Sequence, residues 1–359
     1  MRVLTMVFLS LALYVNARGQ DSLNVTRVAS VTLPGLPGGV ALESDYIYVT
    51  FKRPYYNGLA IIDVSDPSAP TPTGICPFQR AAYGIAVRDN RAYVTLSDNG
   101  LRVVDVANPF SPVVMGSCCW FSSYTAVDVV AAGDYAYMAY GELGFHIVDI
   151  SNPAEPVQAG YIYTPGIVSR VAVAGNYAYV AECEGYELAI MDVSEPTMPV
   201  QIGTYTSPGC IWGVAVEGSL AFIAADSAGL RVLNISNPAN PIEVGFYEVE
   251  DLASDLALQG NYAFVCAGES GLRIMDVSDP TVPVEIGHYT TPGWYATFET
   301  VEGSLAYVAE GPPGSINEQY LNIYDVSAAL SVGRSPTLPA RIALYPAYPN
   351  PFNASTEIR

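Results

Sequence analysis

Short apolar segments separated by turn-forming residues recur along most of the chain. Residues 170–209, RVAVAGNYAYVAECEGYELAIMDVSEPTMPVQIGTYTSPG, contain four of them: VAV, YAYVA, LAIMDV and PVQIGTY. Each alternates or is rich in β-branched residues, and each is bounded by Gly, Pro, Asn or Ser, which predicts four short β-strands. A Gly-Asn pair joins the first two segments, and glycine at the start of a two-residue loop predicts a tight antiparallel hairpin.

The same unit repeats seven times. Its clearest marker is the end of the third strand, DVSDP or a close variant, which begins at Asp63, Asp105, Asp149, Asp192, Asn234, Asp276 and Asp325. Successive markers are 42, 44, 43, 42, 42 and 49 residues apart. Seven four-stranded antiparallel units of this length, with no helical periodicity, predict an all-β fold, a seven-bladed β-propeller.

The ring of blades needs a closure. The seventh repeat supplies only three strands, ATFETV, LAYVA and LNIYDV, whereas the N-terminal segment LNVTRVASVTLPG has the pattern of a fourth strand. We therefore expect Leu23–Leu33 to pair with Leu321–Val326, so that an N-terminal strand completes the last blade and leaves no open sheet edge. The predicted propeller spans residues 21–327.

The repeats carry a family resemblance. Copies such as LAIIDVSDP, LRVVDVANP, FHIVDISNP and LRIMDVSDP resemble the LVIVD repeat of bacterial and archaeal surface proteins, from Leu23 to Ser327. The resemblance implies a propeller at the cell surface. It implies no particular activity, because the family has no general one.

Residues 1–20 predict a signal peptide. They begin with Met-Arg, continue with the apolar run Val3–Val15 and end in small and polar residues. This is the order of a secretory signal, and the apolar run is too short for a comfortable membrane span. The mature protein is expected outside the cytoplasm.

The C-terminal tail contains a candidate sorting signal. The repeat pattern stops after Ser327, residues 328–340 have the composition of a linker, and residues 341–359 contain Tyr348-Pro349-Asn350-Pro351-Phe352-Asn353. This run resembles the opening of the C-terminal sorting domain of type IX secretion. Such domains continue for some tens of residues, so the chain is expected to be a fragment or a truncated product. The resemblance implies the type IX machinery as a partner and secretion or display at the outer cell surface; the alternative is a proline-rich tail with no such role.

Composition excludes several classes of function. A net charge of −20 repels phosphate backbones and anionic lipids, so nucleic acid and membrane insertion are not expected. The chain has two histidines and no CxxC pair, so it has few of the side chains that a metal centre or a Ser-His-Asp triad requires. No phosphate-binding glycine motif stands out, and no cofactor is expected. The recurring aspartate is interpreted as a turn device, because Asp before a turn bonds the local backbone.

One pair of the six cysteines is a candidate disulfide. Cys183 and Cys210 fall in loops on the same face of neighbouring blade elements, and an oxidising compartment would permit a bridge. Cys266 replaces the small alanine of other second strands and is expected to be a buried, inert thiol.

The loops between second and third strands and between blades share one face, and aromatic residues concentrate there. Rigid scaffolds carry function on loops, and Tyr and Trp are typical anchors of binding sites. The predicted ligand-binding residues are Tyr55, Tyr56, Trp120, Tyr124, Tyr186, Trp212, Trp294, Tyr295, Glu182 and Glu310. They predict a non-catalytic binding or scaffold module for a protein or a glycan. The alternative is a carboxylate-dependent extracellular hydrolase or lyase on this face, which a pair of acidic side chains converging across the channel mouth would favour.

Overall fold

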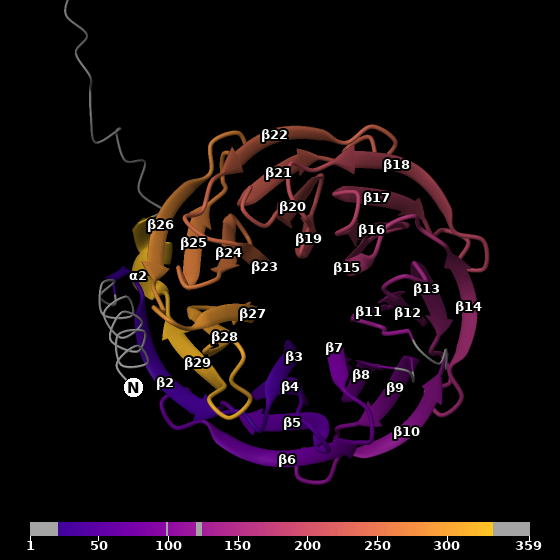
Figure 1. Ribbon diagram of the computed structural model, residues 1–359, viewed down its shortest axis with the longest axis horizontal. Helices are drawn as coiled ribbons and strands as arrows, with labels where there is room; N and C mark the ends of the chain where they lie inside the picture. The colour runs from indigo at the N-terminus through magenta and orange to yellow at the C-terminus, as the bar shows by residue number, and fades with distance from the viewer. Residues whose placement is uncertain (1–20, 98–99, 120–123, 333–359) are drawn as a thin grey trace, which may run out of the picture.

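The computed structural model describes residues 21–97, 100–119 and 124–332, and within them the chain forms seven antiparallel sheets around a central axis (Figure 1). This confirms the predicted seven-bladed all-β propeller. The predicted signal peptide, the sorting segment and most of the predicted linker lie outside the described residues.

The blades, each given from its inner to its outer strand, are as follows. Blade one has β3 (Leu36–Glu43), β4 (Tyr46–Lys52), β5 (Asn57–Asp63) and β6 (Thr71–Phe78); blade two has β7 (Ala82–Arg88), β8 (Arg91–Leu96), β9 (Gly100–Asp105) and β10 (Val113–Cys118); blade three has β11 (Asp128–Ala132), β12 (Tyr135–Ala139), β13 (Phe145–Asp149) and β14 (Val157–Ile162); blade four has β15 (Val168–Ala174), β16 (Tyr177–Glu182), β17 (Glu187–Asp192) and β18 (Val200–Thr206). Blade five has β19 (Gly213–Glu217), β20 (Leu220–Ala224), β21 (Leu230–Asn234) and β22 (Ile242–Tyr247); blade six has β23 (Ala253–Gln259), β24 (Tyr262–Ala267), β25 (Leu272–Asp276) and β26 (Val284–Tyr289), with β1 (Ser22–Leu23) added at its edge; blade seven has β27 (Tyr295–Glu302), β28 (Leu305–Gly311), β29 (Tyr320–Asp325) and β2 (Thr26–Thr32).

The hydrophobic core lies between neighbouring blades. In β16, Ala178, Tyr179, Val180 and Ala181 are all buried. Successive residues of a strand point to opposite faces of the sheet, and both faces of each blade are covered by another blade. The second and third strands therefore read as continuous apolar runs, while the first strands, crowded at the axis, carry small residues.

The recurring aspartate is a turn device, as predicted. In all seven repeats its side-chain oxygen, or that of Asn234, accepts a hydrogen bond of 2.8–2.9 Å from the backbone N–H two residues on. Hydrogen bonds from the side chains of Ser65 and Ser194, and then these backbone bonds, hold the pKa of Asp63 and Asp192 below the ordinary value. The proline that follows lies against the preceding blade: a Cβ on Gly203 in β18 would overlap the Pro238 carbonyl oxygen of the next repeat.

The N-terminal segment closes the ring. β2 pairs antiparallel with β29, from Thr26 opposite Asp325 to Thr32 opposite Tyr320, which confirms the predicted closure. One detail of the prediction is wrong: Ser22 and Leu23 pair with β26 of blade six instead. The segment thus spans the seam between the last two blades, because its first residues pair with the edge strand β26 of blade six before the chain continues along β29 of blade seven.

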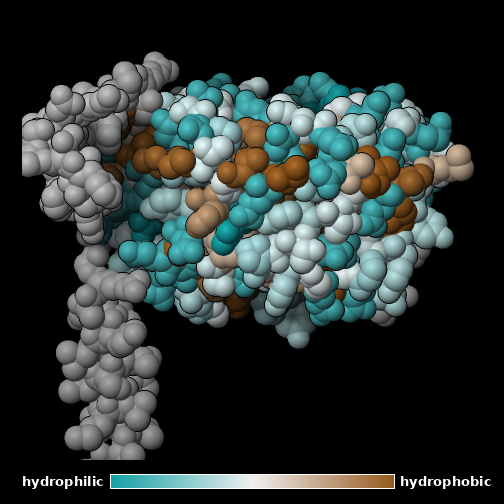
Figure 2. All heavy atoms as spheres, turned by 90° about the horizontal axis from the view of Figure 1, so that it is seen from above, coloured by the Kyte–Doolittle hydropathy of each residue, from teal (hydrophilic) through white to brown (hydrophobic). Residues whose placement is uncertain are grey.

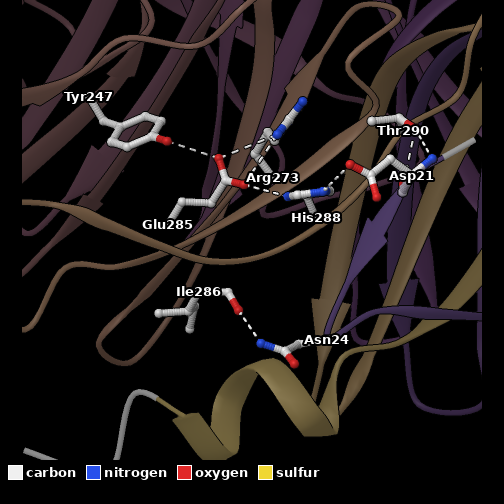
Figure 3. A network of polar contacts seen from close by, with 8 residues as sticks. All are labelled: Asp21, Asn24, Tyr247, Arg273, Glu285, Ile286, His288 and Thr290. Atoms are coloured by element: carbon white, nitrogen blue, oxygen red, sulfur yellow. Dashed lines mark hydrogen bonds and ion pairs between the residues drawn. The ribbon is translucent and has the colours of Figure 1, made fainter. Parts of the chain in front are cut away.

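Side chains reinforce this closure at its start (Figure 3). The Asn24 side chain donates a 2.8 Å hydrogen bond to the Ile286 carbonyl, and the Asp21 backbone N–H donates one of 2.7 Å to Thr290 Oγ1. His288 lies between Asp21 and Glu285, with its Nδ1 2.6 Å from Glu285 Oε1. Arg273 and Tyr247 also contact the Glu285 carboxylate.

The seventh repeat ends differently from the others. Its marker is DVSAA, without a proline, and the chain continues as helix α2 (Ser327–Val332), so the predicted linker begins as a helix. Ala329 is buried beside Gly287 of β26, and the Tyr262 hydroxyl donates a 3.0 Å hydrogen bond to the Leu330 carbonyl. Where other repeats place a proline turn against the preceding blade, this one places a helix.

The outer strands form the side wall of the disc, and apolar patches recur along it (Figure 2). Equivalent positions at the start of five outer strands are more than half exposed: Val113, Val157, Val200, Ile242 and Val284. Among the described segments, none is a helix long and apolar enough to cross a bilayer.

Candidate binding site at the mouth of the channel

The first strands of the blades converge on the axis with one register position in common. It is occupied by Gly39, Gly84, Asp128, Arg170, Gly213, Asp255 and Phe298. A Cβ on any of the three glycines would meet the first strand of the next blade, whereas the other four blades carry larger side chains at this position. The repeat is therefore least regular where its strands face the axis.

A cavity of about 720 Å³ opens at the loop end of this channel. Residues of all seven blades line it, and most of its surface is apolar. Its size lies within the range of small-molecule sites, roughly 300–1,000 Å³. The inner strands β3, β7, β11, β15, β19, β23 and β27 surround the same axis in Figure 1.

Two of the predicted aromatic residues line this cavity. Trp212 lies just before β19 and Tyr295 begins β27; they are 42% and 37% exposed. Tyr83 and Phe298 complete the aromatic part of the wall. The four come from blades two, five and seven, so only the closed ring brings them together.

The other predicted aromatics lie outside the cavity. Tyr55, Tyr56, Tyr124 and Tyr186 are exposed on the loops around it. The Trp294 ring stacks on that of Tyr320, with centroids 4.9 Å apart, in a separate small cleft. Trp120 lies outside the described residues. The aromatic face is thus a central cavity with dispersed tyrosines around it, and not one continuous patch.

The two predicted glutamates are not presented to solvent. Glu182 is 3% exposed and accepts a 3.0 Å hydrogen bond from the Gly166 N–H; Glu310 is 1% exposed and accepts bonds from Asn322 Nδ2 and the Tyr324 hydroxyl. Burial raises the pKa of both carboxyls, that of Glu310 to about 7. Both end second strands inside the blades, where they bond neighbouring chain segments, and neither lines the cavity.

Two cations that the sequence analysis did not select do line it. Lys52 ends β4, and its Nζ lies 4.1 Å from the centre of the Tyr83 ring. The Arg170 guanidinium lies 5.2 Å from the centre of the Phe298 ring, and its Nε is 4.0 Å from Asp255 Oδ1. Burial, and then the positive charge of Arg170, lower the pKa of Lys52. The sequence signal was Arg170 itself, the one basic residue at its register position in the seven repeats.

Asp255 and Glu299 lie on first strands near the axis without lining the cavity, whereas the exposed Glu184 does line it. Burial, with the Asp128 charge acting in the same sense, raises the pKa of Asp255 to about 7 although Arg170 opposes the shift. Glu299 is buried, its pKa is raised by burial and by Asp255, and the Cys266 thiol lies 3.4 Å from its Oε2. Cys266 is buried, and burial raises the pKa of its thiol. Within the described ranges no group of three or more His, Cys, Asp or Glu side chains could hold a metal ion.

Disulfides lie on the same face. Cys183 and Cys210 are bonded, with Cα atoms 4.5 Å apart, and link the loop after β16 to the segment before β19. Cys183 and Trp212 both line the cavity, so this bridge ties together two parts of its wall. Cys118 and Cys119 are bonded to each other, a pairing that the sequence analysis did not anticipate.

The fold and the cavity define a closed propeller with an axial cavity on its loop face. A model of the LVIVD repeat matches residues 34–77, 79–119, 125–164, 165–207, 208–249 and 252–291. These matches cover more than half of the chain, which therefore belongs to the LVIVD repeat family. They correspond to blades one to six.

Solved structures of low sequence identity show a similar fold. The chain is similar to the computationally designed Ika8 protein, with a TM-score of 0.59, 8% identity and coverage of 85% of this chain and 100% of that one. It is also similar to a chain of a mitotic checkpoint complex, with a TM-score of 0.67, 11% identity and coverage of 85% and 93%. These likenesses concern the fold alone. A search of curated proteins finds no match.

Proposed function

We propose that this protein is a secreted or cell-surface binding module, without catalytic activity, whose ligand enters the mouth of the axial channel. The observation that carries the proposal is the cavity of about 720 Å³ with Trp212 and Tyr295 in its wall. Concave, mostly apolar pockets with a few charged groups are typical binding sites. The tyrosines on the surrounding loops provide a wider surface on which a protein or a glycan would rest.

The location rests on both ends of the chain. The predicted N-terminal signal peptide and the type IX-like segment Tyr348–Asn353 support this proposal of export to the outer surface. The Cys183–Cys210 bridge is compatible with this route, because disulfides persist in oxidising compartments. Deletion of residues 341–359 is expected to retain the protein inside the cell, which immunoblots of the cell and medium fractions of the producing bacterium would detect.

A hydrolase or lyase is the less favoured function. Paired carboxylates would have to reach a substrate, yet Glu299 and Glu310 are buried in the blades. Asp255 lies beside Arg170 and accepts a hydrogen bond from the N–H of Leu256. None of the three lines the cavity. The geometry therefore supports binding over acid–base chemistry.

The test is a screen for ligands, followed by affinity measurements on two variants, one on the face that carries Trp212 and one on the opposite face. Trp212→Ala removes an aromatic wall of the cavity, whereas Phe110→Ala removes a 68% exposed aromatic from a turn after a third strand, on the other face. Loss of a central aromatic anchor costs about 2 kcal/mol or more, roughly 30-fold in affinity. We expect that loss for Trp212→Ala alone. A ligand that depends on Phe110 and is indifferent to Trp212 would refute the proposed face.

A further inference from the structure

We infer that the axial cavity binds a small organic acid, with a carboxylate held between Lys52 and Arg170 and a flat apolar body against the aromatic wall. This inference rests on the proposed function and adds the chemical class of the ligand. It starts from a contrast: the protein carries a net charge of −20, yet two of the three charged residues that line its cavity, Lys52 and Arg170, are positive. The third, Glu184, is exposed to solvent.

The first step concerns Lys52. Among the described residues, no carboxylate lies within 4.0 Å of its ammonium group. Its contact is the Tyr83 ring, 4.1 Å away, and the charge of Arg170 acts on it unfavourably. Two like charges in a largely apolar cavity repel each other more strongly than in water. An anion between them would relieve this repulsion.

The second step concerns Arg170. Its nearest carboxylate, Asp255, is 4.0 Å away, which is at the outer limit of an ion pair. Part of the guanidinium donates to the Ser169 carbonyl, and its face lies over the Phe298 ring. Guanidinium groups hold carboxylates through paired N–H donors. The cavity therefore offers the remaining guanidinium N–H groups of Arg170 and the Lys52 ammonium as donors for the two oxygens of a carboxylate.

The third step separates this ligand from a sugar. A sugar ring needs many free polar partners, but the serine and threonine hydroxyls of the wall already donate to backbone carbonyls. Ser169 bonds the carbonyls of Ala181 and Ile211, Ser254 bonds those of Cys266 and Ala296, and Thr297 bonds that of Ala309. The Gln319 amide donates to the Ser315 carbonyl. The ligand that suits the remaining features of the wall is therefore an apolar molecule with one charged group.

The carboxylate probe is 2-naphthoate, and 2-naphthamide serves as its uncharged counterpart. Isothermal titration of the full chain should show the carboxylate binding at least about tenfold more tightly than the amide, which corresponds to about 1.4 kcal/mol. Lys52→Met should abolish this difference by weakening the carboxylate and leaving the amide unchanged. Arg53→Met is the matched control, because Arg53 is the next residue but is exposed and bonds Asn317 outside the cavity.

Three results would overturn the inference: equal affinities for the two probes, an unchanged preference in Lys52→Met, or no binding of 2-naphthoate at millimolar concentration. Trp212→Ala tells the two proposals apart. If both probes bind equally and Trp212→Ala weakens both, the cavity is a binding site and only the charge assignment fails. If any ligand found is indifferent to Trp212→Ala, the proposed function fails as well.

Discussion

The closure of the ring can be tested with one substitution, Leu33→Ala. Leu33 follows β2, is 3% exposed, and packs with Ile47, Val49 and Ile323 between blades seven and one. Its N–H also donates a 2.7 Å hydrogen bond to the Gln319 carbonyl. Truncation of a buried leucine to alanine leaves a cavity at this seam and costs about 2–5 kcal/mol.

The cost converts to a shift in melting temperature. The unfolding entropy is about 2.1 cal/mol/K per residue, so for a propeller of roughly 310 residues each kcal/mol lowers Tm by about 1.5 °C. Leu33→Ala should therefore lower Tm by about 3–8 °C in calorimetry. Deleting residues 21–33 also removes the buried side chains of Val25 and Val31. At about 1.5–3 kcal/mol for each buried side chain, that loss approaches the whole stability of a typical domain, and we expect no folded protein.

The control is Leu23→Ala in β1. Leu23 is 45% exposed and pairs with His288, so its truncation should lower Tm by less than about 1 °C. A melting temperature for Leu33→Ala within 1 °C of the wild type, or a larger effect of Leu23→Ala, would show that the N-terminal strand does not lock the ring.

Three further changes in stability are expected. The Glu310 carboxyl has a pKa of about 7 in the folded protein against an ordinary 4.5, so the free energy of unfolding should fall as pH rises from about 5 to 8. Glu310→Gln should reduce this fall by up to about 3 kcal/mol in urea titrations, whereas Glu302→Gln, at an exposed position, should leave it unchanged. Gly203→Val should destabilise by about 1–3 kcal/mol or more, because its Cβ would meet the Pro238 carbonyl oxygen; a wild-type Tm would contradict this contact. Replacing both Cys183 and Cys210 by serine opens a bridge with a sequence separation of 27 and should cost about 3.5 kcal/mol by chain entropy, whereas mass mapping that finds both as free thiols would exclude the bridge.

The sequence by itself determined the architecture, because a repeat encodes each blade locally. The alternation of YAYVA, the glycine hairpins and the aspartate turns each depend on residues within one unit of about 42. The missing fourth strand of the last repeat and the surplus strand at the N-terminus were equally visible. The partner of Leu23 was wrong, since its two-residue pairing with β26 depends on how the chain crosses the seam. The helix at Ser327–Val332, where a linker was expected, was not predicted either.

The binding site was decided by the tertiary structure. Loop position in the sequence placed Glu182 and Glu310 on the functional face, but packing between blades buries both. Lys52 and Arg170 belong to blades one and four and share a cavity only because seven first strands meet at one axis. A local pattern states which face of a strand is apolar; it does not state which side chains from distant repeats converge, because that depends on closing the ring.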